Sequence, residues 1–388
     1  MRYDFDTPVD RRATASIKWD YSRRFTGLKG LLPLWVADMD FPACAEVIEA
    51  LEDRTQHGVF GYTLEPRSYY QAVIEWMRRR HGWEIRRDWM VSAPGVVPSL
   101  NLALLAYSQP GDGVIIQPPV YYPFRESIEN NERRVVENPL RLDGNRYSMD
   151  LVQLEERIDE NTRLLILCSP HNPVSRVWSP QELERLVEIC TRRKIIILSD
   201  EIHHDLIMPG HRHTPTASLS REAAEVTVTL TSATKTFNLA GLGCSLVISP
   251  NPQLRKRYQD SQKRICTGIA NALSTVATEA AYRHGESWLQ QVLEYIRGNY
   301  EFLTAFLEQR LPAARVIPLE GTYLAWVDLR ALGLTDEQLK ERILKQARIW
   351  LDDGPMFGSG GEGFQRINLA CPRSTLDQAL EAMVRVLG

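Results

Sequence analysis

Three apolar runs in the middle of the chain are each followed directly by polar residues that could do chemistry. LLILC (164–168) leads into SPHNP, IIILS (195–199) into DEIHHDL, and VTVTL (226–230) into TSATKTF. If these runs are neighbouring strands of one parallel sheet, their carboxyl ends meet at one edge, where open α/β sheets bind ligands. The sequence therefore predicts that an amide, a carboxylate, an imidazole and an amine converge on one polar ligand, from Asn172, Asp200, His203 and Lys235.

Asp200 and Lys235 have the most specific chemistry of this set. A lysine amine can form a Schiff base with a carbonyl cofactor, and a carboxylate can keep a ring nitrogen protonated, as in enzymes that use pyridoxal phosphate. Taken singly, Asp200 could equally be a helix cap or an ion-pair partner, and Lys235 a solvated lysine. The hypothesis of a cofactor site depends on the two residues together.

Such a cofactor also needs a site for its phosphate, and SAPGVVPSLNLALLAYS (92–108) offers a candidate. Gly95 permits close backbone approach, and the amides of Gly95, Val96 and Val97 would face the dianion at a helix N-terminus. Ser232 could add a hydroxyl. The sequence thus predicts a phosphate cup made largely of backbone.

The elements that must position these residues are short, β-branched runs without strict alternation, which is typical of strands buried on both faces of a mostly parallel sheet. GVIIQ (113–117) and SLVIS (245–249) read in the same way. A helix with Ser179 as its cap and Glu182 three residues later separates two of the runs. The pattern indicates an α/β architecture.

The last hundred residues read differently. A long amphipathic helix over 275–310 is followed by strands at 323–329 and 364–370 around a helix at 336–347, which predicts a smaller α+β domain. The predicted division is 1–47 as an N-terminal segment and part of the small domain, 48–286 as a large cofactor-binding domain, and 287–388 as the C-terminal small domain.

SPHNP (169–173), SDEIH (199–203) and SATKTF (232–237) resemble the class I/II aminotransferase family of fold-type I pyridoxal phosphate enzymes. WVADMDFP, GYT, HNPVSRVW, KTFNLAGL and EGTYLAWVD more narrowly resemble its MalY/PatB-type cystathionine β-lyase (C–S lyase) branch, and the similarity covers roughly residues 30 to 375. The resemblance implies a large domain with a mostly parallel sheet between helices, a smaller α+β domain, and bound pyridoxal 5′-phosphate.

The resemblance also implies roles for individual residues. Lys235 would carry the cofactor as a Schiff base and then move protons, and Asp200 would pair with the pyridine nitrogen. Tyr121, in PPVYYPF, would stack on the ring, and Asn172 would hydrogen-bond its phenolic oxygen. His203 stands where many aminotransferases have a tyrosine, a departure that is similar to the lyase branch.

On the substrate side, the resemblance implies that Arg366 in FQRINLA clamps the α-carboxylate, with Arg373 as a nearby competitor. Arg366 could also be a surface arginine of the strand. The expected border of the substrate pocket consists of Trp35, Ala37 and Asp38.

Two further features of the family concern the phosphate. Tyr62 in GYT would reach the phosphate of the neighbouring subunit, which makes a homodimer the expected unit. The arginine that the family usually has eight residues after the lysine is replaced by Gly243, so Ser232, backbone amides and Tyr62 would carry more of the binding.

The resemblance implies a C–S β-lyase that cleaves L-cystathionine or related cysteine S-conjugates to a thiol, pyruvate and ammonia. The alternative is a pyridoxal-phosphate-dependent aminotransferase, because the two reactions diverge only after the α-proton is removed. A third possibility is a ligand-sensing module of a transcriptional regulator, against which the lack of an amino-terminal basic helix-turn-helix argues.

Composition excludes several other classes. The chain has 46 Lys and Arg against 49 Asp and Glu, which gives no electrostatic support for a nucleic-acid or anionic-membrane partner. No stretch approaches the roughly 18 apolar residues of a membrane helix, and the polar amino terminus lacks a signal-peptide core. Six widely spaced cysteines fit a reducing cytoplasm.

Two motifs are discounted. GSGGEG (358–363) leads into a strand-like segment instead of a helix, so no dinucleotide site is expected there. The pairs His203 with His204 and His211 with His213 have no carboxylate or cysteine at metal-site spacing, and the second pair reads as loop histidines. No metal is expected from the sequence.

Overall fold

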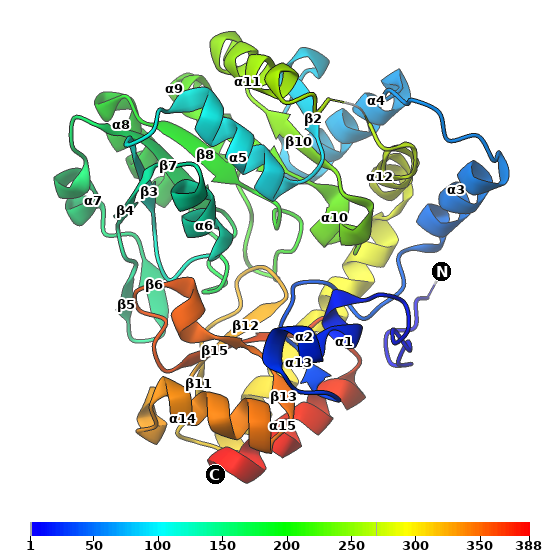
Figure 1. Ribbon diagram of the computed structural model, residues 1–388, viewed down its shortest axis with the longest axis vertical. Helices are drawn as coiled ribbons and strands as arrows, with labels where there is room; N and C mark the ends of the chain where they lie inside the picture. Colours follow the sequence, from blue (N-terminus) through cyan, green and yellow to red (C-terminus); the bar gives the residue numbers. More distant parts are fainter. Residues whose placement is uncertain (1, 269) are drawn as a thin grey trace.

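The centre of the molecule is a seven-stranded sheet, described here from a computed structural model that covers residues 2–268 and 270–388 (Figure 1). The strand order is β2-β10-β9-β8-β7-β3-β4. The strands are β2 (Met90–Ala93), β3 (Gly113–Ile116), β4 (Arg134–Glu137), β7 (Thr162–Cys168), β8 (Ile196–Asp200), β9 (Thr227–Thr231) and β10 (Ser245–Ile248). Strands β4, β3, β7, β8 and β9 pair in parallel, whereas β10 is antiparallel to both of its neighbours. The predicted mostly parallel sheet is confirmed.

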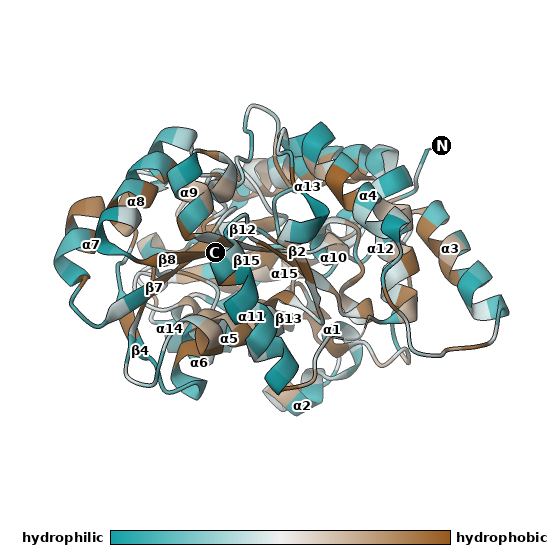
Figure 2. Cartoon of the chain, turned by 90° about the horizontal axis from the view of Figure 1, so that it is seen from above, coloured by the Kyte–Doolittle hydropathy of each residue, from teal (hydrophilic) through white to brown (hydrophobic). Residues whose placement is uncertain are grey.

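Both faces of this sheet are covered by helices, and the strand residues alternate between two cores. Leu164 and Ile166 of β7 pack into one apolar cluster with α5 (Val96–Tyr107) and α11 (Pro252–Arg264). Leu165 and Leu167 of the same strand pack into another cluster, with α8 (Pro180–Arg193). Burial on both faces explains why the runs are continuously apolar, and Figure 2 shows them as hydrophobic strands between helices with hydrophilic outer sides.

The helix between β7 and β8 begins as the sequence predicts. The Ser179 hydroxyl accepts the Glu182 N–H, and the Glu182 carboxylate accepts the Ser179 N–H in return. This capping box satisfies two N–H groups that the first helical turn leaves without partners. The unit β7-α8-β8 therefore has a defined start for its crossover helix.

A second, four-stranded antiparallel sheet lies below the first in Figure 1. Its order is β11-β12-β15-β14, and the long helix α13 (Glu286–Arg310) and α15 (Arg373–Leu387) pack beside it. The strands are β11 (Arg315–Val316), β12 (Leu324–Asp328), β14 (Asp352–Asp353) and β15 (Phe364–Asn368). The amino-terminal chain joins this region, because β1 (Leu32–Pro33) pairs in parallel with β13 (Ile349–Trp350).

The helix predicted over 275–310 is two helices, α12 (Ala272–His284) and α13, which meet at Gly285. A Cβ at Gly285 would lie 2.4 Å from Phe237 Cε1 and 2.6 Å from the Ala281 carbonyl oxygen, so only glycine fits this junction. The domain boundaries at 47 and 286 stay a prediction. Among the described residues, no helix combines the length and the apolar character that crossing a bilayer requires.

Candidate functional site

Strands β7, β8 and β9 deliver their following residues to one edge of the large sheet. Cys168 is in register with Asp200, and Asp200 with Leu230. The segments that follow these strands all leave the sheet at this edge. There the Ser169 N–H donates to the Asp200 carbonyl oxygen (2.9 Å), and the Glu201 N–H donates to the Leu230 carbonyl oxygen (2.8 Å). The predicted convergence of three strand ends has its structural basis in this register.

Lys235 lies in the short helix α10 (Ala233–Thr236), directly after β9. Its Nζ donates to the carbonyl oxygen of Ala37 at 2.5 Å, and the Tyr323 hydroxyl donates to the same oxygen at 2.8 Å. Burial lowers the pKa of Lys235 to about 8, with the charge of Arg366 adding to the effect. The amine is therefore still mostly protonated at pH 7, but its neutral fraction there is much larger than that of an ordinary lysine.

Asp200 is 4% exposed, and its Oδ1 accepts the Ile202 N–H at 3.1 Å. Burial, together with the neighbouring charge of Glu201, raises the pKa of Asp200 to about 7, while the Ile202 N–H and Lys235 oppose the shift. Asp200 and Lys235 are thus two buried ionisable groups that each lack a full counter-charge. Such a pair is suited to a ligand that brings both a basic and an electrophilic atom.

Arg366 on β15 lies beside Asn172 and Trp35 in the same pocket. Its Nη1 donates to Asn172 Oδ1 (3.0 Å), and its Nη2 donates to the Trp35 carbonyl oxygen (2.8 Å) and forms an ion pair with Asp352. Asp352 sits opposite Arg366 in the register of β14 and β15. Because an arginine only donates, the Asn172 oxygen faces it and the Asn172 NH₂ is left for another acceptor.

His203 and Tyr121 are uncharged in this pocket. His203 is buried, its Nδ1 finds no hydrogen-bond partner among the described residues, and burial lowers its pKa well below the ordinary value, with Lys235 and Arg366 adding to the shift. Burial raises the pKa of Tyr121, so its phenol is neutral. The pocket therefore offers a neutral imidazole and a neutral aromatic ring.

The predicted phosphate cup lies at the start of α5, where Gly95 is the N-cap. A Cβ at Gly95 would meet only Pro98, at 3.4 Å, so the protein neighbours leave room for an anion to approach the amides. The Ser232 hydroxyl accepts the Thr234 N–H and donates to the Cys244 carbonyl oxygen at 2.7 Å. Ser232 would have to give up that bond to donate to a phosphate, and its role stays a prediction.

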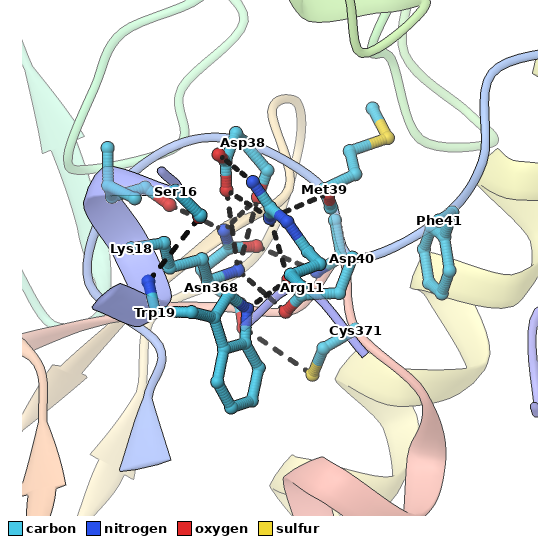
Figure 3. A network of polar contacts seen from close by, with 12 residues as sticks. Arg11, Ser16, Lys18, Trp19, Asp38, Met39, Asp40, Phe41, Asn368 and Cys371 are labelled. Carbon is cyan, nitrogen blue, oxygen red and sulfur yellow. Dashed lines mark hydrogen bonds and ion pairs between the residues drawn. The ribbon is translucent and has the colours of Figure 1, made fainter. Parts of the chain in front are cut away.

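The loop that carries Trp35, Ala37 and Asp38 is held from three sides (Figure 3). Asn368 Nδ2 donates to the carbonyl oxygens of Val36 and Asp38, both at 2.7 Å. Asn238, three residues after Lys235, donates to the carbonyl oxygens of Met39 (3.0 Å) and Phe41 (2.8 Å). The Ala37 carbonyl oxygen is therefore fixed relative to both Lys235 and Arg366.

The third side is an ion network from the first twenty residues. Lys18 Nζ lies 2.7 Å from Asp40 Oδ2, and Arg11 pairs with Asp38 (2.7 Å) and with Asp40 (2.8 Å). The Lys18 side chain is fully buried, and Trp19 Nε1 also donates to Asp40, at 2.9 Å. Figure 3 shows Arg11, Lys18 and Trp19 of the amino-terminal segment beside Asp38 and Asp40 of the loop.

Replacing Asp40 by asparagine is expected to destabilise the fold by about 3 to 5 kcal/mol, because it leaves the buried Lys18 charge without its nearest counter-charge. Chemical unfolding followed by circular dichroism measures this. Asp10→Asn is the matched control, since Asp10 is exposed and its ion pair with Arg12 spans 3.7 Å; its expected change is within about 0.5 kcal/mol. Equal stability of the two variants would contradict the prediction.

Residues 29–383 match the family Aminotransferase class I and II. The chain belongs to this family. It is 41% identical to cystathionine beta-lyase PatB of Bacillus subtilis (strain 168), over 386 residues that cover 99% of this chain and 100% of that protein.

Two solved structures of the family are similar over the full length. Cystalysin from Treponema denticola, which contains pyridoxal 5′-phosphate, is 40% identical with a TM-score of 0.96, and covers 100% of this chain and 99% of its own. A protein from Clostridium difficile 630 that carries pyridoxal phosphate and is described as an aminotransferase is 42% identical with a TM-score of 0.98, over 100% of both chains. The predicted family, branch and fold are confirmed.

The structure separates the two candidate carboxylate clamps. Arg366 lies in the pocket, whereas Arg373 Nε donates to Asn299 Oδ1 of α13 at 2.6 Å and stacks over Phe302. Tyr62 is 97% exposed on the connection between α3 (Ala45–Gln56) and α4 (Arg67–Trp76), and the structure does not bring it to the Lys235 pocket of its own chain.

Two polar residues of this pocket, Tyr323 and Asp352, were not predicted from the sequence. Tyr323 stands in EGTYLAWVD, where a hydroxyl directly before a buried strand was the available signal. Asp352 follows a short strand in IWLDDG, and burial raises its pKa to about 6. The only sequence signal for Asp352 was its position directly after apolar residues.

Proposed function

We propose that this chain is a pyridoxal-phosphate-dependent C–S β-lyase that cleaves L-cystathionine or related cysteine S-conjugates to a thiol, pyruvate and ammonia. The observation that carries this proposal is the pairing of buried Lys235 and Asp200 at one sheet edge, in a chain 41% identical over its length to a cystathionine β-lyase. The substrate class follows from that relationship and from a pocket with one arginine for a carboxylate.

The residues present fit pyridoxal phosphate. Its carbonyl carbon suits the amine of Lys235, whose pKa is lowered to about 8, its ring nitrogen suits the buried carboxyl of Asp200, and its phenolic oxygen suits the Asn172 NH₂. The unpartnered Nδ1 of His203 is a further polar atom that such a ring can satisfy. When bound, the cofactor supplies a ring that accepts electrons from the substrate's α-carbon.

The chain's own residues would then bind substrate and move a proton. Arg366 holds the α-carboxylate, for which the carboxylate must displace Asp352 or the Trp35 carbonyl oxygen from Nη2. Lys235 Nζ takes the α-proton, and the Ala37 carbonyl oxygen and Tyr323 orient the amine for that step. The sulfur leaves as a thiolate, and one water is consumed as the three-carbon product becomes pyruvate and ammonia.

The assay that tests this proposal follows both reactions of the family in parallel. With L-cystathionine alone, thiol and pyruvate are expected in equal amounts. With an amino acid and a keto acid, little new amino acid is expected. The second candidate function is an aminotransferase, favoured by the similarity to the Clostridium difficile protein; a new amino acid without thiol release would establish it and reject the lyase.

Capture of pyridoxal phosphate by the cofactor-free chain is expected to accelerate as the pH rises through about 8. Burial lowers the pKa of Lys235 from 10.5 to about 8, so the neutral, nucleophilic amine forms above that pH. At pH 7 this shift increases the neutral fraction about 300-fold over an ordinary lysine. The growth of the visible absorbance after mixing, followed across pH, gives the midpoint. A midpoint near 10.5 would contradict the shift.

We propose that the functional unit is a homodimer in which Tyr62 reaches the phosphate site of the neighbouring subunit. The connection that bears Tyr62 runs along the edge of the molecule in Figure 1, and its apolar side chains are exposed: Val59 (63%), Phe60 (60%) and Leu64 (79%). Apolar side chains gathered on one exposed segment favour a protein contact.

Mixing two inactive subunits tests this arrangement. In a heterodimer of Tyr62→Ala and Lys235→Ala chains, one of the two sites contains both intact residues only if Tyr62 acts across the interface. Co-refolded mixtures are therefore expected to regain about a quarter of wild-type turnover, since about half of random dimers are mixed and each has one intact site. Absence of any recovery, with dimers present by size-exclusion chromatography, would show that Tyr62 acts within its own chain.

We also propose a cytoplasmic location, which the six free cysteines support, four of them buried. We also propose the domain division after residues 47 and 286. The pairing of β1 with β13 supports grouping the amino-terminal segment with the small sheet.

A further inference from the structure

A cluster of histidines and carboxylates is buried behind the Lys235 pocket and has no part in the proposed reaction. His81 ends the π-helical turn η1 (Met77–His81) after α4, and His204 and Asp205 follow β8. The three residues are 7%, 0% and 0% exposed, and each offers one ligand atom within 4.8 Å of the other two. Because 124 residues separate His81 from Asp205, the sequence spacing gave no sign of this cluster.

The hydrogen bonds of His204 fix its tautomer. Its Nδ1 lies 2.6 Å from the Glu201 carbonyl oxygen, which can only accept, so Nδ1 carries the hydrogen. Nε2 of a neutral His204 is then a lone pair, and it points at Asp205 Oδ2 from 3.2 Å without a hydrogen-bond partner in the described chain. The place between these two atoms suits a cation, which is either a proton on Nε2 or a metal ion.

The charge of the surroundings also calls for a cation. Glu201 and Asp205 are both fully buried carboxylates. The guanidinium nearest to Asp205 is Arg80, with Nε at 3.3 Å, and Arg80 is shared with Glu286 at 2.8 Å. Arg80 therefore serves two carboxylates, and a further cation, either a proton on His204 or a metal ion, would offset the remaining buried negative charge.

The ligand atoms are supported in the way that metal ligands usually are. Asp205 accepts the Trp76 indole N–H (3.1 Å) and the Thr236 hydroxyl (2.9 Å), and the Glu201 carbonyl oxygen orients His204. His213 donates its Nε2 hydrogen to Glu201 at 3.0 Å and adds a third buried imidazole, with a free Nδ1. Such outer hydrogen bonds set ring orientation at metal sites.

A cavity of about 680 Å³ opens beside the cluster and is lined by His81, His204, His211 and His213 among others. It provides a route for an ion and room for a water molecule as a further ligand. Both residues of the predicted loop pair lie outside helices and strands; His213 is buried, while His211 is exposed.

We propose that His81, His204 and Asp205 bind one divalent transition-metal ion of the zinc type, with water from the cavity completing the coordination. Two imidazoles and a carboxylate are the ligand set that Zn²⁺ accepts, at about 2.0 to 2.2 Å. His81 donates its Nε2 hydrogen to Asp205 at 2.8 Å, so binding moves that hydrogen to Nδ1 or releases it to solvent. The ion would fasten the end of α4 to the turn that follows β8.

The test uses the chelator-treated holoenzyme, dialysed against Zn²⁺ at about pH 8, which is above the ordinary imidazole pKa of about 6.5. About one zinc per chain is expected by atomic emission, with a rise in the unfolding temperature. His81→Gln and His204→Gln are each expected to lower zinc affinity at least about tenfold. His211→Gln, an exposed histidine of the same cavity, is the matched control and is expected to retain the wild-type affinity. Co²⁺ in place of zinc is expected to give the visible bands of a four-coordinate site.

Three results would overturn the proposal. The first is no stoichiometric uptake of zinc by the wild-type holoenzyme. The second is unchanged uptake by His204→Gln or lost uptake by His211→Gln, which would locate the ion elsewhere. The third is a doubly protonated His204 by ¹⁵N NMR at that pH with zinc present, which would make a proton the bridging cation. Circular dichroism in chelator shows whether each variant is folded, and either folded cluster variant decides the question.

Discussion

Lys235→Ala is expected to reduce turnover at least about 10³-fold and to abolish the visible absorbance of bound cofactor. In the proposed reaction its amine is the nucleophile for the cofactor and the base for the α-proton, and a positioned base alone contributes about 10² to 10⁴ in rate. No other lysine amine is placed to substitute, since within the described chain the Ala37 carbonyl oxygen is met only by Lys235 and Tyr323. Thiol release and the absorption spectrum of the purified variant measure the two effects.

The control for this variant is Lys263→Ala, on the outer helix α11, which is expected to keep both signals. Circular dichroism should match the wild type, because removing an amine that lacks a full counter-charge relieves burial cost instead of adding to it. A Lys235→Ala enzyme that stays coloured and active would show that the site is wrongly placed.

Asp200→Asn is expected to lower kcat by about 10² to 10³, with the fold intact. The amide keeps the shape of the carboxyl and can still accept the Ile202 N–H, but it cannot hold a ring nitrogen in its protonated form. The loss should fall on kcat more than on KM, because the proposed substrate contact, Arg366, lies on another strand, β15. Steady-state kinetics with L-cystathionine separates the two constants.

Asp260→Asn, on the exposed face of α11, is the control for charge removal and is expected to change neither constant. The spectrum adds a second readout, since the visible band of the Asp200 variant should shift with the protonation of the ring. A variant with wild-type kcat and an unshifted band would remove Asp200 from the mechanism.

The sequence could predict the large sheet and the place of the pocket for one physical reason. Strands buried on both faces must be continuously apolar, so polar residues such as Asn172 and Asp200 stand out where each strand ends. Parallel pairing brings those ends to one edge, so their convergence can be predicted without knowing the conformations of the loops. Lys235 follows the same logic, because it comes one turn after β9.

Contacts between distant segments could not be predicted in this way. Nothing in MRYDFDTPVDRR or IKWD announces that Arg11 and Lys18 will pair with Asp38 and Asp40, since the partners face each other only after the loop has folded back. The Asp352 carboxylate, likewise, acquires its partner through the register of two short antiparallel strands. Register depends on turn geometry and packing, which local patterns do not encode.

The loop over residues 35–38 is held in place by distant segments, and this matters for chimeras built from relatives of this chain. The carbonyl group that meets the reactive lysine is aligned by Arg11 and Lys18 through their ion pairs and by Asn368 from the small sheet. A carboxyl-terminal third transplanted from another enzyme without its matching first forty residues would mismatch that carbonyl group. In a chimera, the first forty residues and the carboxyl-terminal third should therefore come from the same parent enzyme.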